Sequence, residues 1–158
     1  MTDSAKVDAR IAVTFTDHCF TRDRRQGDAA DLAFPGCSRD DGVFCLQRYH
    51  HSLQAPAYIR DFHRAVAWNL KGDETYAVIP TVTQDGQAQH YAIIFSLDRV
   101  RGVEGIDLHM RVRTAHPRTE RDLTTYGSIR FAHLVRLRRE NQRPRRVYDS
   151  RRRKPRRP

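Results

Sequence analysis

The chain has 158 residues, of which 30% are charged, and a formal net charge of +10 at pH 7. No apolar stretch approaches the roughly 18 residues that a membrane-spanning helix needs, and residues 1–10 lack the apolar core of a classical signal peptide. Its three cysteines, an odd and sparse number, favour a reducing compartment over a disulfide framework. We therefore expect a cytoplasmic protein whose length corresponds to one globular domain.

The N-terminal third is expected to hold one short strand and a long loop. Residues 11–16 alternate apolar and small polar side chains, which predicts a strand. Residues 22–42 are rich in Asp, Arg and Gly, which predicts a loop with one short helix near residues 29–34. A loop of this length inside a domain is often functional.

The clearest helical pattern follows this loop. Apolar side chains recur at helical spacing between Pro56 and Gly72, which predicts a helix over residues 56–70. These side chains are Ile59, Phe62, Val66 and Leu70.

Beyond Gly72 the apolar period is two residues, which predicts strands. The expected strands are residues 76–83, 90–97 and 108–115, and Asp85-Gly86 is a hairpin signal between the first two. Residues 128–138 suit a strand or a helix, and we favour a strand. The fold class expected from this order is α+β: an antiparallel meander of 4–5 strands packs one face against one main helix, within a single domain of residues 1–142.

The last sixteen residues, 143–158, hold nine Arg or Lys and one Asp, and so contribute +8 of the net charge. A terminal block of like charge repels itself, so we expect a disordered tail whose partner is a polyanion. Nucleic acid is the first candidate, with RNA favoured over DNA, and an anionic membrane surface is the second. An Arg bias also arises in GC-rich genomes, and charged tails can simply solubilise a protein. The residues expected to contact nucleic acid are Arg130, Arg136, Arg138, Arg143, Arg145, Arg146, Arg151, Arg152, Arg153, Lys154, Arg156 and Arg157.

Strict alternation along the strands predicts a sheet with one apolar and one basic face. Tyr91, Ile93, Phe95 and Leu97 would face the helix, as would the apolar residues of 108–112. The outer face would gather imidazole and guanidinium groups and no carboxylate. Such a face is either an ordinary solvated surface or a platform for a phosphate.

RNA can be cleaved without a metal when a 2′-hydroxyl attacks the neighbouring phosphate. The protein then supplies a base, an acid and cations for the developing charge, and imidazole can fill either proton role near neutral pH. The candidate catalytic residues are His90, His109, Arg111, Arg113 and His116.

The order of helix and meander, with basic strands, resembles the RelE-like and barnase-like ribonuclease group, which includes toxins and phage-associated nucleases. The resemblance covers roughly residues 56–138 at the level of architecture. It implies an active site on the exposed sheet face, onto which His90, His109, Arg111, Arg113 and Tyr126 can be matched. No strand carboxylate matches the general base of the barnase type.

A second constellation of soft ligands lies in the N-terminal third. Six residues could make a zinc site, although no Cys-x-x-Cys pair is present and buried free cysteines are the commoner outcome. These residues are His18, Cys19, Cys37, Cys45, His50 and His51.

The sequence thus favours a small metal-independent ribonuclease of a toxin-like or phage-associated kind, without a cofactor. The alternatives are a non-catalytic RNA- or DNA-binding protein and a small interaction protein. In the last case the tail would dock on an acidic partner or be covered by an inhibitor or antitoxin.

Overall fold

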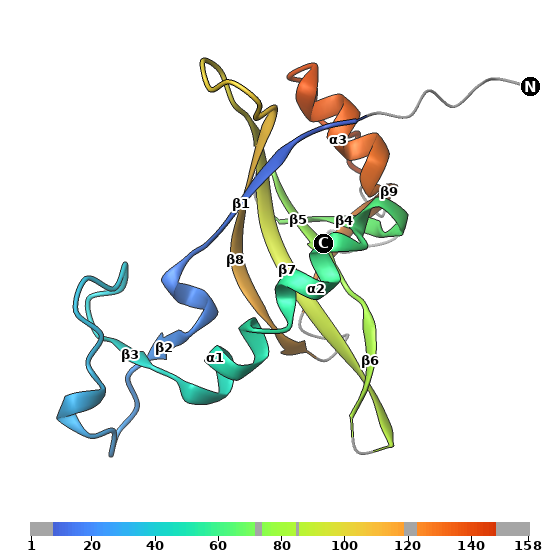
Figure 1. Ribbon diagram of the computed structural model, residues 1–158. Helices are drawn as coiled ribbons and strands as arrows, with labels where there is room; N and C mark the ends of the chain where they lie inside the picture. Colours follow the sequence, from blue (N-terminus) through green and yellow to red (C-terminus); the bar gives the residue numbers. More distant parts are fainter. Residues whose placement is uncertain (1–7, 72–73, 85, 119–122, 148–158) are drawn as a thin grey trace, which may run out of the picture.

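The computed structural model describes residues 8–71, 74–84, 86–118 and 123–147, and in it one large sheet is covered by short helices (Figure 1). The strands are β1 (Ile11–Phe15), β2 (Thr21–Asp23), β3 (Gly42–Phe44), β4 (Val66–Leu70), β5 (Thr75–Val78), β6 (Thr81–Gln84), β7 (Gln87–Arg99), β8 (Leu108–Arg118) and β9 (Thr125–Arg130). The helices are α1 (Leu46–Ser52), α2 (Ala55–Arg60) and α3 (Phe131–Arg139), and three 3₁₀ turns are η1 (Asp17–Cys19), η2 (Ala30–Leu32) and η3 (Phe62–Arg64).

The α+β class is confirmed, but the sheet is a mixed one of seven strands rather than an antiparallel meander of 4–5. Six strands follow the order β1-β8-β7-β5-β4-β9, and β6 pairs with the first part of β7. The N-terminal strand β1 lies parallel to β8, with Ile11 opposite Leu108. A meander was expected because local patterns show which segments are strands and not which distant strands pair.

The expected inner face of the sheet is confirmed. All four predicted residues of β7 are fully buried, as are the apolar residues of the first half of β8. Phe62 of η3 and Phe131 of α3 pack their rings against Phe95 of β7. Helices α2 and α3 therefore close the core on this face.

The predicted helix over residues 56–70 is correct only for its first part. Helix α2 ends at Arg60, and residues 66–70 form strand β4 between β5 and β9. Val66 is 45% exposed while Ala67 is fully buried, so the burial alternates as in a strand. The helical spacing of the apolar residues is outweighed by pairing of β-favouring Val66 and Trp68 with strands on both sides.

The predicted strand over residues 128–138 is wrong beyond Arg130, where α3 begins. The helical alternative is the correct one for that part. Phe131, Leu134, Val135 and Arg138 are buried, and their spacing of three, four and seven residues from the first defines one face of a helix.

The outer face of the sheet is not the uniformly basic surface that was expected. Buried Leu70, Ala77 and Ile94 form a second apolar cluster there, with Ile79 and Leu123 packed against it. Strand β7 also extends to Arg99, which brings the carboxylate of Asp98 opposite His109. The sequence did not predict either feature, because each strand was considered separately and the strand over residues 90–97 was expected to end at Leu97.

The first residues of the predicted tail lie against the domain. The backbone N–H of Val147 donates to the Tyr126 carbonyl at 3.0 Å, and Arg146 donates to the Leu70 carbonyl at 3.3 Å. Residues 148–158, which hold six of the twelve expected nucleic-acid contacts, lie outside the described residues. Within the described ranges, none of the helices has the length and apolar character required to cross a membrane.

Candidate functional site

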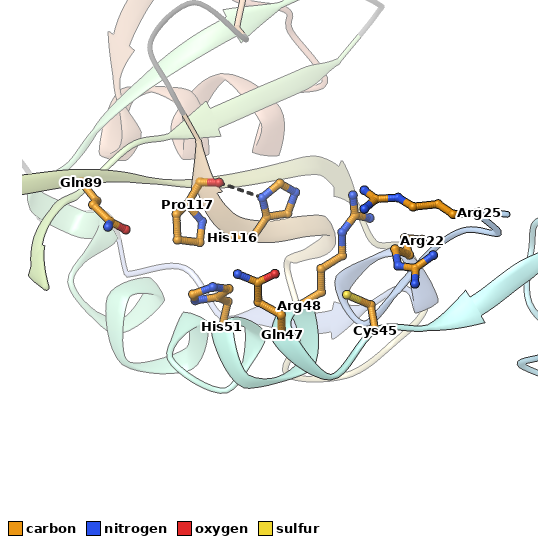
Figure 2. A pocket seen from close by; sticks show the side chains of 9 residues that line it. All are labelled: Arg22, Arg25, Cys45, Gln47, Arg48, His51, Gln89, His116 and Pro117. Atoms are coloured by element: carbon orange, nitrogen blue, oxygen red, sulfur yellow. Dashed lines mark hydrogen bonds between the residues drawn. The ribbon is translucent and has the colours of Figure 1, made fainter. Parts of the chain in front are cut away.

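A pocket of about 400 Å³ lies where α1 meets the end of β8 (Figure 2). We call it the α1–β8 pocket. Its lining contains three guanidinium groups, two imidazoles and a thiol, and no carboxylate among the described residues. The lining residues are Arg22, Arg25, Cys45, Gln47, Arg48, His51, Gln89, His116 and Pro117.

Two elements bring the basic side chains together. Arg48 and His51 are one turn apart on α1, so they share a helix face. The hydroxyl of the buried Tyr91 lies within hydrogen-bonding distance of the carbonyl oxygens of His51 and Ala115. This contact holds the end of α1 against β8 and thereby keeps His51 in the same pocket as His116.

The hydrogen bond of His116 determines its tautomer. Its Nδ1 lies 2.9 Å from the Pro117 carbonyl oxygen, which can only accept, so Nδ1 carries the proton. The other ring nitrogen, Nε2, is buried and has no hydrogen-bond partner in the described parts of the chain. In the neutral ring this nitrogen is therefore a proton acceptor without a partner.

Both imidazoles are disposed to be neutral at pH 7. Burial lowers the pKa of His116 from 6.5, and the nearby charges of Arg118, Arg48 and His51 lower it further, against the opposing effect of the Pro117 carbonyl. Burial also lowers the pKa of His51, with a further contribution from His50. Desolvation and like charges both disfavour the imidazolium.

The three guanidinium groups of the pocket differ in how firmly they are held. Arg22 forms two hydrogen bonds of 2.7 Å to Asp28, and these hold the pKa of that carboxyl below its usual range. Arg48 donates to the Thr21 carbonyl at 2.7 Å. Arg25 is exposed, and its side chain has no partner among the described residues. Arg48 and Arg25 thus retain donors for an anion.

The face of β8 that carries His116 holds further buried donors. Thr114, His116 and Arg118 alternate along the strand, so they share one face, and each has a buried polar side-chain atom without a partner in the described ranges. Buried polar groups are normally satisfied, and exceptions call for an explanation such as an absent ligand or water. This row of three residues is therefore a candidate surface for a ligand.

Comparison with known proteins places the chain in a family. The model of the YjaZ family matches residues 1–139, which is most of the chain. The chain belongs to the YjaZ family. No curated protein and no solved structure matches this YjaZ-family chain significantly.

In this YjaZ-family protein the five predicted catalytic residues do not converge. His116 lies in the α1–β8 pocket, whereas His90 lines a different pocket on the outer sheet face. His109 lies seven residues from His116 on β8, roughly 23 Å at the rise of a strand, and its Nε2 is 2.7 Å from the Thr14 hydroxyl. Arg111 and Arg113 are exposed on the part of β8 next to β1. The predicted catalytic residues of β7 and β8 therefore belong to different places on the sheet and do not form one site.

The arginines that were expected to bind nucleic acid differ in how exposed they are in the structure. Arg130, Arg136 and Arg145 are exposed, and their contact with nucleic acid stays a prediction. Arg138 is only 3% exposed, and it donates to the Leu97 carbonyl at 2.8 Å and pairs with Glu74 at 3.0 Å. The prediction for Arg138 is therefore wrong, because the buried face of α3 includes this residue. Arg143 also pairs with Glu74.

Several residues of the site were missed by the sequence analysis. Arg22, Arg25, Arg48 and Arg118 were not singled out, and Cys45 and His51 were considered only as zinc ligands. Two local signals were available: Arg48 and His51 at helical spacing, and His116 and Arg118 at strand spacing. The strand was expected to end before Pro117. A proline is tolerated there because, among the described strands, β8 beyond Val112 is paired on one side only.

The six candidate zinc ligands do not come together either. No group of three or more His, Cys, Asp or Glu side chains within the described ranges is arranged to hold a metal. Cys19 is buried against β8, where burial raises its pKa to about 11, and Cys45 and His51 line the α1–β8 pocket. Closeness within 34 residues of sequence does not bring side chains from a turn, a loop and a helix to one point.

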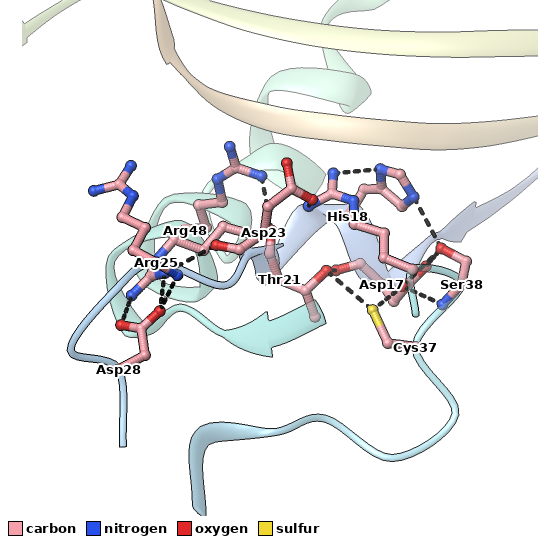
Figure 3. A network of polar contacts seen from close by, with 11 residues as sticks. Asp17, His18, Thr21, Asp23, Arg25, Asp28, Cys37, Ser38 and Arg48 are labelled. Carbon is pink, nitrogen blue, oxygen red and sulfur yellow. Dashed lines mark hydrogen bonds and ion pairs between the residues drawn. The ribbon is translucent and has the colours of Figure 1, made fainter. Parts of the chain in front are cut away.

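Hydrogen bonds hold the long loop in the described structure (Figure 3). Cys37 donates to Asp17 at 2.9 Å, and the Ser38 N–H donates to the same carboxylate at 2.9 Å. The Ser38 hydroxyl is 2.9 Å from His18 Nε2, and Arg39 donates to His18 Nδ1 at 2.7 Å. Because Arg39 can only donate, Nε2 carries the His18 proton and cannot act as a base toward Ser38. The cluster is therefore not a serine-hydrolase triad.

Replacing Asp17 with asparagine should destabilise the fold by about 1–3 kcal/mol, because the amide would present a donor to groups that donate. Burial alone would raise the pKa of Asp17, but the hydrogen bonds of Cys37 and Ser38 outweigh it and lower the pKa from 3.8 to about 2. The stabilisation is therefore present above about pH 4 and is lost as the pH falls toward 2. Urea unfolding at several pH values measures it. The control is Asp40→Asn, which changes an exposed carboxylate of the same loop. Equal free energies of unfolding for the two variants would contradict the stabilising role of the Asp17 hydrogen bonds.

Proposed function

We propose that this protein binds RNA in the α1–β8 pocket and cleaves it without a metal ion. The observation that supports this most strongly is the pocket lining: two imidazoles with lowered pKa values stand beside three guanidinium groups, with no carboxylate among the described residues. Guanidinium groups bind phosphate through paired hydrogen bonds. Two imidazoles can divide the acid and base roles of a transesterification.

The chemistry assigns a role to each group. His116 Nε2 accepts the proton of the ribose 2′-hydroxyl as the 2′-oxygen bonds to phosphorus. The bond from phosphorus to the 5′-oxygen breaks, and His51 donates its proton to that leaving oxygen. Arg48 and Arg25 stabilise the charge that develops on the phosphoryl oxygens. The products are a 2′,3′-cyclic phosphate and a 5′-hydroxyl end.

The proposed active site lies at the edge of the sheet rather than at the centre of its outer face. The proposed reaction, metal-independent RNA cleavage, is the one that the sequence predicted. The RelE-like and barnase-like resemblance stays a prediction at the level of architecture. The basic segment after residue 147 is proposed to increase the affinity and the rate of encounter with RNA through its charge. It contributes no group to the chemical step.

A cleavage assay on mixed-sequence RNA in excess EDTA tests the proposal. The wild-type protein should cut, and the double variant His51→Ala/His116→Ala should not. His133→Ala, an exposed histidine on α3, is the matched control and should cut normally. Cleavage that disappears in EDTA would reject the metal-independent mechanism. RNA binding without any cleavage would favour a non-catalytic binding protein.

The pH profile of kcat/KM should be bell-shaped with its maximum below pH 6.5. This profile reports the free enzyme, in which both imidazoles have pKa values lowered from 6.5. As the pH rises toward 7 the acid loses its proton, and at low pH the base gains one, so both limbs shift to the acid side. Rates measured between pH 4.5 and 8 would check this. A maximum well above pH 7 would contradict the assignment.

A further inference from the structure

A second pocket, of about 340 Å³, opens on the outer face of the sheet. We call it the Trp68 pocket. Its walls include apolar and polar side chains, namely Trp68, Ile79, Thr81, His90, Arg118 and Leu123. Pockets that combine an aromatic surface with a few polar groups are the usual form of small-molecule subsites.

The register of the sheet places this pocket on the face that carries the unpartnered row of β8. Trp68 lies opposite Ala77, Ala77 opposite Ile94, and Ile94 opposite Thr114. Directly opposed residues lie on the same face of a sheet. Trp68 therefore shares its face with Thr114 and, by alternation along the strand, with Arg118.

Arg118 connects the Trp68 pocket with the α1–β8 pocket. Its Nε is buried without a partner in the described structure, and its side chain lines the Trp68 pocket. Its charge also lowers the pKa of His116, which lies two residues away on the same strand face, roughly 7 Å along it. A ligand that occupies both pockets therefore needs an anionic group close to a planar one.

Trp68 supplies a surface for a planar group. The indole is 36% exposed, although it lies beside the buried cluster of Leu70, Ala77 and Ile94. A large aromatic side chain that stays accessible next to an apolar cluster and a cation provides the stacking surface on which proteins bind nucleobases. Hydroxyl groups of Thr81 and Thr125 in the pocket lining can bond to base edges.

We propose that the Trp68 pocket binds a nucleobase of the RNA whose phosphate occupies the α1–β8 pocket, with stacking on Trp68. This inference rests on the proposed function for the position of the phosphate. It adds a subsite that selects single-stranded RNA, because a base inside a duplex is not free to stack on a protein side chain.

Fluorescence gives a direct test, because Trp68 is the only tryptophan of the chain. The full-length protein is titrated with AMP, with UMP and with ribose 5-phosphate, which has the same phosphate and sugar but no base. At least one nucleotide should quench the emission saturably, and ribose 5-phosphate should not. Absence of quenching by both nucleotides, or equal quenching by ribose 5-phosphate, would overturn the inference.

Calorimetry with the Trp68→Ala variant provides the second measurement. The quenching nucleotide should bind about 5- to 150-fold more weakly, which is the range of one base stack, and ribose 5-phosphate should bind as to the wild type. Val66→Ala, an exposed apolar residue of the same strand, is the control. Unchanged nucleotide affinity in Trp68→Ala would overturn the inference.

The two proposals can fail separately. RNA cleavage in EDTA without nucleotide quenching would reject the base subsite and keep the proposed function. Quenching without any cleavage would support the base subsite and reject the ribonuclease mechanism.

Discussion

Replacing His116 with alanine should reduce RNA cleavage by about 10²- to 10⁴-fold, the usual contribution of a general acid or base. The variant loses Nε2, the buried proton acceptor that has no partner in the described structure. RNA binding should change much less, because Arg48 and Arg25 still line the pocket. Single-turnover cleavage and filter binding measure the two effects separately.

The control for this experiment tests whether the active site lies in the α1–β8 pocket or at the centre of the sheet face. His109 lies on the same strand but bonds to Thr14 and faces Asp98. His109→Ala should therefore cleave at nearly the wild-type rate. A large loss of cleavage in His109→Ala, together with an active His116→Ala, would move the site back to the sheet face on which the sequence analysis placed it.

Replacing Arg138 with methionine should destabilise the fold by about 3–5 kcal/mol, the cost of removing one partner from a buried charged network. The guanidinium donates to the carbonyls of Leu97 and Gln142 and pairs with Glu74 at 3.0 Å. Methionine fills similar volume and leaves these acceptors without their donor. Urea unfolding followed by circular dichroism measures the difference.

Arg136→Met is the matched control, because Arg136 is exposed on the same helix. Its effect should stay within about 0.5 kcal/mol. If Arg138→Met were as stable as Arg136→Met, the guanidinium of Arg138 would not be the link between α3 and β7 that the structure indicates.

The sequence was most informative where a local pattern and the packing agree. The alternation in β7 and the first half of β8 predicted the buried face, because each second residue meets the core. The hairpin between β6 and β7 was also predicted correctly, with Gln84 opposite Gln87 in the structure.

Sequence patterns predicted the wrong secondary structure or topology where pairing between distant strands determines the structure. The apolar residues of 66–70 fit a helix by spacing, yet β5 and β9 on either side make the segment a strand. The parallel position of β1 beside β8 depends on contacts between residues almost one hundred positions apart. No local signal reports such a contact.

The candidate site depended on the same long-range contacts. His116 was predicted as a catalytic residue and His51 as a metal ligand, and nothing in the sequence connected them. Their connection is the packing of α1 on β8, where Tyr91 reaches the carbonyl of His51. Chemistry-bearing residue types could be read from the sequence, but their grouping into one pocket could not.

The most direct test of the central claim is mass spectrometry of the products from a DNA oligonucleotide that contains a single ribonucleotide, incubated with the protein in EDTA. The mechanism predicts one cut, on the 3′ side of the ribonucleotide, with a 2′,3′-cyclic phosphate on one product and a 5′-hydroxyl on the other. An uncut oligonucleotide, a cut elsewhere, or a product with a 5′-phosphate would contradict it.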